Sequence, residues 1–175
     1  MDVCRFLTIT AISPAIGLLA SIVHAQDGSI VDLGLLAAST SLGAFVGVGF
    51  AGGRSAGDHP ARRYAFLGLV SAAALACFVY LPVGPFSMAP LAVIGAAAFA
   101  QAVWNTSRIR EVADRAYQAR LQAVTLMAFT LGFSLGTLWA GVAIDRFGLI
   151  ALAGGAAVLG LLLVVAVVLC EDGVL

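Results

Sequence analysis

Six apolar stretches recur along this chain, and short polar segments separate them. Each stretch is near the ~20 residues that a helix needs to cross ~30 Å of hydrocarbon. Because backbone N–H and C=O groups in lipid must be satisfied within their own segment, we expect helices here. Transmembrane strands would alternate apolar and polar residues, and these stretches do not. The expected spans are residues 6–23, 33–52, 64–81, 87–106, 121–144 and 149–170.

The polar segments between the spans hold the turn-forming residues, and we expect them to be loops. They are residues 26–28, 53–63, 82–85, 108–120 and 145–148. No long linker divides the chain. The sequence therefore predicts an all-α polytopic membrane protein, with one six-helix transmembrane domain over residues 1–175.

The composition excludes most soluble classes of protein. The chain is 62% hydrophobic and 10% charged, whereas a soluble domain is about 45–50% apolar and about 25% charged. Net charge is zero and all nine basic residues are arginine, so we expect no nucleic-acid partner. The three cysteines are scattered and fit neither a metal spacing nor a disulfide set. We expect no metal and no cofactor.

The arginines predict an orientation in the membrane. Successive polar segments lie on alternate sides of the membrane, and this assignment puts eight of the nine arginines on one side. That side carries Arg5, Arg54, Arg62, Arg63, Arg108, Arg110, Arg115 and Arg120, and the other side carries only Arg146. The positive-inside rule places the first side in the cytoplasm. We therefore expect a multi-pass protein of the cell (inner) membrane with both termini in the cytoplasm.

The first span has an alternative interpretation. Residues 6–23 followed by Val23-His24-Ala25 resemble a signal peptide with a small-residue cleavage site. Its charged start is weak, because Asp2 cancels Arg5. Cleavage would leave five helices.

A short internal repeat links the second and fifth spans. Ser41-Leu42-Gly43 returns as Ser134-Leu135-Gly136, an offset of 93 residues, the difference between positions 134 and 41. Three spans fit within this offset, so the two copies would insert in opposite orientations. This predicts two inverted three-helix repeats, as in many transporters.

No set of residues fits a catalytic site. Serines are scattered inside the spans, and His24 and His59 fall at opposite membrane faces. We expect no enzyme activity. No ionisable residue lies at the middle of any span, so the chain shows no carboxylate for proton coupling.

Polar side chains on two spans are candidates for a cavity wall. Gln101, Asn105 and Arg108 follow at i, i+4 and i+7 and share one helix face. Polar groups in membrane helices usually face a water-filled cavity or a partner. Alternatively, Gln101 bonds a neighbouring helix and the other two mark the interface. Thr10 and Pro14 share a face of the first span, as a cavity wall or as a mild kink among packing residues.

The segment 105–148 contains a recognisable pattern of charged residues and glycines. An Asn near the end of one span is followed by a loop of acidic and basic residues, and then by a span that ends in Gly-x-x-x-Asp-Arg-x-Gly. The matching residues are Asn105, Glu111, Asp114, Arg115, Arg120, Gly141, Asp145, Arg146 and Gly148. This pattern resembles helices ten and eleven of the major facilitator superfamily, in the efflux branch of siderophore and macrolide exporters. Ala113 stands where Pro is usual, and Gln118-Ala119 where Arg-Gly is usual.

A second, weaker match follows the second span. Asp58, Arg62 and Arg63 fit the family signature there, while His59 and Ala61 replace Arg and Gly. By resemblance, the charged loop residues would act in gating, or else they are solvated loop ends. The gating candidates are Asp58, Arg62, Arg63, Arg108, Arg120, Asp145 and Arg146.

The resemblance implies the C-terminal six helices of a twelve-helix carrier. Such a carrier would move a small organic solute, by efflux, through alternating access. It would need a second six-helix half, either an N-terminal half or another copy of this chain. The alternative is a non-transporting membrane protein, either a truncated carrier or an accessory or assembly subunit.

Small residues at four-residue spacing mark the second and fifth spans. They are Gly43 and Gly47 on the second and Gly132 and Gly136 on the fifth. Small residues allow helix backbones to approach in lipid. By resemblance these helices would face the second half, and the alternative is packing inside the six-helix unit.

Overall fold

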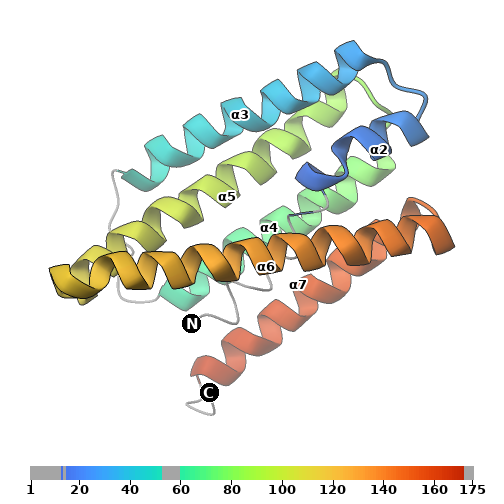
Figure 1. Ribbon diagram of the computed structural model, residues 1–175. Helices are drawn as coiled ribbons and strands as arrows, with labels where there is room; N and C mark the ends of the chain where they lie inside the picture. Colours follow the sequence, from blue (N-terminus) through green and yellow to red (C-terminus); the bar gives the residue numbers. More distant parts are fainter. Residues whose placement is uncertain (1–12, 14, 53–59, 172–175) are drawn as a thin grey trace.

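The computed structural model describes residues 13, 15–52 and 60–171, and the regular elements among them are all α-helices (Figure 1). The helices are α2 (Leu19–Ala25), α3 (Ile30–Gly52), α4 (Pro60–Tyr80), α5 (Pro85–Val112), α6 (Arg115–Phe147) and α7 (Ile150–Glu171). Residues 13 and 15–17 are also helical and precede α2 across a turn at Leu18. The expected all-α fold is confirmed for the described residues.

Four helices are long and apolar enough to cross a membrane. Their apolar parts are Ile30–Gly52, Arg62–Tyr80, Pro85–Glu111 and Arg115–Phe147, which coincide with the second to fifth expected spans. The α7 backbone covers the sixth expected span, and its described apolar part is the shorter segment Ile150–Leu162. Much of the first span lies outside the described residues, so six crossings stay a prediction.

The polar segment 108–120 is not the loop that the sequence suggests. Helix α5 continues to Val112 and α6 begins at Arg115, so Ala113 and Asp114 alone form the turn. Arg, Glu and Gln have good helix propensity, so the charged residues extend both helices beyond their apolar parts.

A glutamine side chain closes this turn. Gln118 Nε2 donates hydrogen bonds to the carbonyl oxygens of Ala113 at 3.0 Å and Arg110 at 3.4 Å. Both carbonyls lie at the C-terminal end of α5, where the helix offers them no backbone partner. Gln118 therefore ties the start of α6 to the end of α5.

Four helices lie side by side in the order α3, α5, α4, α7 (Figure 1). Helix α6 runs across this row in Figure 1 and contacts α5 and α7. The short α2 packs beside α3. Because α5 touches α3, α4 and α6, it is the central element of the described bundle.

Helices α3 and α5 approach backbone to backbone. A Cβ atom added at Gly43 would collide with the backbone of Ala92, and one added at Gly47 with the backbone of Ala96. In the opposite direction, a Cβ at Gly95 would collide with the Thr40 carbonyl oxygen. The small-residue face of α3 is therefore occupied by a helix of the same chain, the alternative left open by the sequence. It is not free to contact a second half.

The small residues of α6 are also covered. Gly132, Gly136 and Ala140 are buried within the chain. Nearby on α6, Phe133 and Thr137 contact Gly17 of the helical segment 15–17. The expectation that Gly132 and Gly136 face a second half is therefore not supported either.

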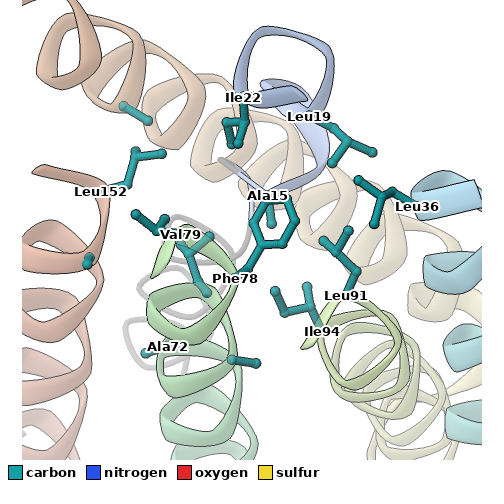
Figure 2. Close-up of a cluster of buried hydrophobic side chains, with 14 of the residues drawn as sticks. Ala15, Leu19, Ile22, Leu36, Ala72, Phe78, Val79, Leu91, Ile94 and Leu152 are labelled. Atoms are coloured by element: carbon teal, nitrogen blue, oxygen red, sulfur yellow. The ribbon is translucent and has the colours of Figure 1, made fainter. Parts of the chain in front are cut away.

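The apolar core lies where α2, α3, α4, α5, α6 and α7 converge (Figure 2), with α6 contributing Ala140. Phe78 of α4 is fully buried near its centre and faces Leu91 and Ile94 of α5. Ile22 and Leu152 close the cluster from α2 and α7. This core holds α5 in place between its neighbours.

The outer faces of α3 and α6 are apolar and exposed. Only 17% of the most apolar stretch of α6 is buried inside the protein. The buried share is 28% for the corresponding stretch of α3 and 50% for that of α4. Phe45 and Val46 on α3 and Met127 on α6 are each more than two-thirds exposed. Apolar faces of this extent are typical of surfaces in contact with lipid or with another protein.

Candidate functional site

A cavity of about 630 Å³ opens between α5, α6 and the helical segment 13–17. Its wall is mostly apolar, with hydroxyl and amide side chains set into it. The lining residues are Ser13, Ile16, Ala98, Phe99, Gln101, Ala102, Asn105, Thr106, Ala119, Gln122, Ala123, Thr125, Leu126, Phe129 and Phe133. Its volume and lining are those of a small-molecule site.

Gln101 and Asn105, the two cavity candidates on the fourth expected span, both line this cavity. Their side chains are 4% and 7% exposed, and they lie one turn apart on α5. Gln101 Nε2 is shielded from solvent and has no hydrogen-bond partner among the residues that the structure describes. A buried polar group without a partner is costly, at about 1–3 kcal/mol. Nε2 therefore bonds no described residue of a neighbouring helix.

Thr10 and Pro14, the other cavity candidates, lie outside the described residues. Two of their neighbours, Ser13 and Ile16, do line the cavity. Ser13 is 1% exposed. Ser13 and Ile16, from the middle of the first expected span, therefore contribute to one wall of the site.

Sequence reasoning missed the wall that α6 contributes. Gln122 and Thr125 of α6 line the cavity and face it together with Phe129. These three residues follow at i, i+3 and i+7, the spacing of one helix face. Gln122 is also a polar residue inside an apolar span, and that signal marks it in the same way as Gln101.

The lining sets limits on the chemistry of the cavity. None of the described lining residues has an ionisable side chain. Among the described residues, no three His, Cys, Asp or Glu side chains gather as metal ligands do. The described wall can therefore bind a molecule through apolar contact and amide or hydroxyl hydrogen bonds.

Of the charged residues after the second span, the structure describes Arg62 and Arg63, which lie at one end of the bundle. Asp58 is outside the described residues, and Arg62 and Arg63 are exposed in the first turn of α4. The guanidinium carbon of Arg63 lies 5.8 Å from the centre of the Trp104 ring, which tilts against Phe50 at 6.4 Å. This cation–π and aromatic cluster joins α3, α4 and α5 at the arginine-rich end.

The remaining gating candidates lie on helices and at two separate ends. Arg108 is half-buried on α5, and Arg120 is exposed near the start of α6. Asp145 and Arg146 are exposed in the last turn of α6. At ~1.5 Å per residue, Arg120 and Asp145 are about 38 Å apart along the helix. These residues therefore do not form one cluster.

Comparisons with protein-family models, with curated proteins and with solved structures gave no match to this chain. The likeness to facilitator-type carriers therefore depends on the motifs in the sequence.

Proposed function

We propose that this chain is one six-helix half of a facilitator-type carrier that moves a small organic solute by alternating access. The observation that carries the proposal is the cavity between α5, α6 and the segment 13–17, with Gln101 and Asn105 in its wall. Polar side chains in membrane helices usually face a cavity or a partner, and Gln101 Nε2 has no partner in the described part of the chain.

Two glycine contacts support an inverted repeat. A Cβ at Gly95 of α5 would meet Thr40 and Ala44 of α3. A Cβ at Gly17 would meet Phe133 and Thr137 of α6. Positions 133 and 137 follow positions 40 and 44 by 93 residues, which is the same offset that separates the two copies of the sequence repeat. The contact of the fourth span with the second therefore has a counterpart between the first and the fifth, as an inverted repeat requires.

A second six-helix half completes the proposed carrier. It is an N-terminal half or another copy of this chain. Helices α3 and α6 occupy equivalent positions in the proposed repeat. Of the four candidate membrane spans, these two have the smallest buried share of their apolar stretches. Their outward faces, with Phe45 on α3 and Met127 on α6, leave apolar surface for such a half or for lipid.

The proposed setting is the cell (inner) membrane with both termini in the cytoplasm. Arg62 and Arg63 at the start of α4 lie at the same end of the bundle as the turn between α5 and α6 (Figure 1). Arg110 and Arg115 flank that turn, whereas Arg146 is at the other end of α6. Under the positive-inside rule the arginine-rich end is cytoplasmic.

Alternating access can be tested before the solute is known. Ala98 lines the cavity at the middle of α5, and we place a cysteine there in a chain whose native cysteines are replaced by serine. A membrane-impermeant thiol reagent is added to right-side-out and to inside-out vesicles. A carrier exposes position 98 to each side in turn, so Ala98→Cys should react in both preparations.

Ser29→Cys, at the turn between α2 and α3, is the control and should react from one side only. Reaction of Ala98→Cys from a single side would refute alternating access. It would favour the alternative, a non-transporting membrane protein such as an accessory subunit.

A further inference from the structure

The described wall of the cavity carries no charge. It is built from aromatic and aliphatic side chains and six uncharged polar ones, which are Ser13, Gln101, Asn105, Thr106, Gln122 and Thr125. Placing a charged ligand in a site of this kind removes its hydration and offers no opposite charge in return. The wall therefore disfavours both anions and cations, and favours a molecule that is apolar over most of its surface.

One group in the wall needs a hydrogen-bond acceptor. Gln101 is 4% exposed, and its Nε2 is shielded from solvent and has no partner within residues 13, 15–52 and 60–171. When the Gln101 side chain turns its amide toward the cavity space, a ligand oxygen that accepts from Nε2 would remove the cost of the unpaired donor. Apolar lining with a few placed polar groups is the usual way in which a pocket orients a ligand.

We propose that the cavity takes an uncharged, mainly apolar organic molecule whose carbonyl or ether oxygen accepts a hydrogen bond from Gln101. Phe99 and Phe129 contact its apolar part from α5 and α6. This inference rests on the proposed function for the use of the site, but the binding chemistry is tested separately.

The first test uses three photoreactive probes with one ketone scaffold, on the unmodified full chain in lipid nanodiscs. They are benzophenone, which is neutral, benzoylbenzoate, an anion, and benzoylbenzyl trimethylammonium, a cation. Illumination followed by mass spectrometry locates the labelled peptides. Benzophenone should label the peptides of Phe99 and Phe129 in preference to the exposed Phe45 on α3. Stronger cavity labelling by either charged probe, or equal labelling of Phe45, would overturn the proposal.

The second test isolates the hydrogen bond. Fluorenone and fluorene share a ring system, and only fluorenone has an acceptor oxygen. Each is titrated as a competitor of benzophenone labelling, with unmodified chain and with Gln101→Met, which keeps the side-chain volume. The advantage of fluorenone over fluorene should fall about tenfold in Gln101→Met, the value of one buried hydrogen bond. Comparing the ratio cancels the different membrane partitioning of the two competitors.

Gln26→Leu is the matched control, because Gln26 lies outside the cavity lining and should leave the ratio unchanged. An unchanged ratio in Gln101→Met would refute the role of Gln101. Cavity labelling by benzophenone with one-sided reactivity of Ala98→Cys would support the ligand class and refute transport. Two-sided reactivity with cavity labelling by a charged probe would refute the ligand class alone.

Discussion

Gly43 of α3 lies directly against the backbone of Ala92 in α5, where a side chain of even one carbon has no room. This contact fixes one face of α5 against α3. Another face of α5 presents Gln101 and Asn105 to the cavity. The close packing of the two helices therefore sets the position of the cavity wall.

Gly43→Ala should destabilise the bundle by about 1–3 kcal/mol, because the added methyl group forces α3 away from α5. Thermal unfolding in detergent, followed by circular dichroism, measures the change. Gly49→Ala is the matched control on the same helix, since a Cβ at position 49 meets nothing within 4 Å. Equal unfolding temperatures for the two variants would contradict the close α3–α5 contact.

Gln101→Leu should lower solute flux and cavity binding while leaving thermal stability unchanged or higher. The substitution removes a buried amide whose Nε2 has no partner among the described residues, at the site that we propose binds a ligand. Expression, unfolding temperature and benzophenone labelling are measured together. Asn105→Leu, one turn along α5, should lower flux and labelling in the same way. A clear loss of stability in Gln101→Leu with labelling intact would assign Gln101 to helix packing.

Gly155→Ala should loosen the contact between α6 and α7. A Cβ at position 155 would collide with the Trp139 ring, so the ring must shift or the helices must separate. We expect a loss of about 1–3 kcal/mol in unfolding free energy. Gly154→Ala, where a Cβ meets nothing within 4 Å, is the neighbouring control and should cost little. Trp139→Phe should recover part of the loss in the double variant, because it shortens the colliding ring.

The positions 29 and 55 should lie on opposite sides of the membrane. They flank the span Ile30–Gly52, and the arginines place position 55 in the cytoplasm. Ser29→Cys and Ser55→Cys, each in a chain without native cysteines, are labelled with an impermeant thiol reagent in intact cells. Only Ser29→Cys should react. Reaction of both from outside would refute the predicted topology.

Much of the helical fold can be predicted locally. Apolar length alone predicts the second to fifth spans, and each has a helix in the structure. The shared face of Gln101 and Asn105 also follows from helix period alone, and both residues line one cavity. The segment 108–120 was harder, because its charged residues suit a solvated loop and a helix end equally well.

The sequence by itself determined that the second to fifth spans are helical and that Gln101 and Asn105 share a helix face, because both depend on residues a few positions apart. Only the tertiary structure decided that the small residues of α3 face α5, and that α6 and the segment 13–17 complete the cavity around Gln101. Lipid provides no hydrophobic drive between helices, so lateral pairing depends on close surface fit. That fit depends on the surfaces of both helices. The small residues of one helix therefore do not identify the helix that packs against them.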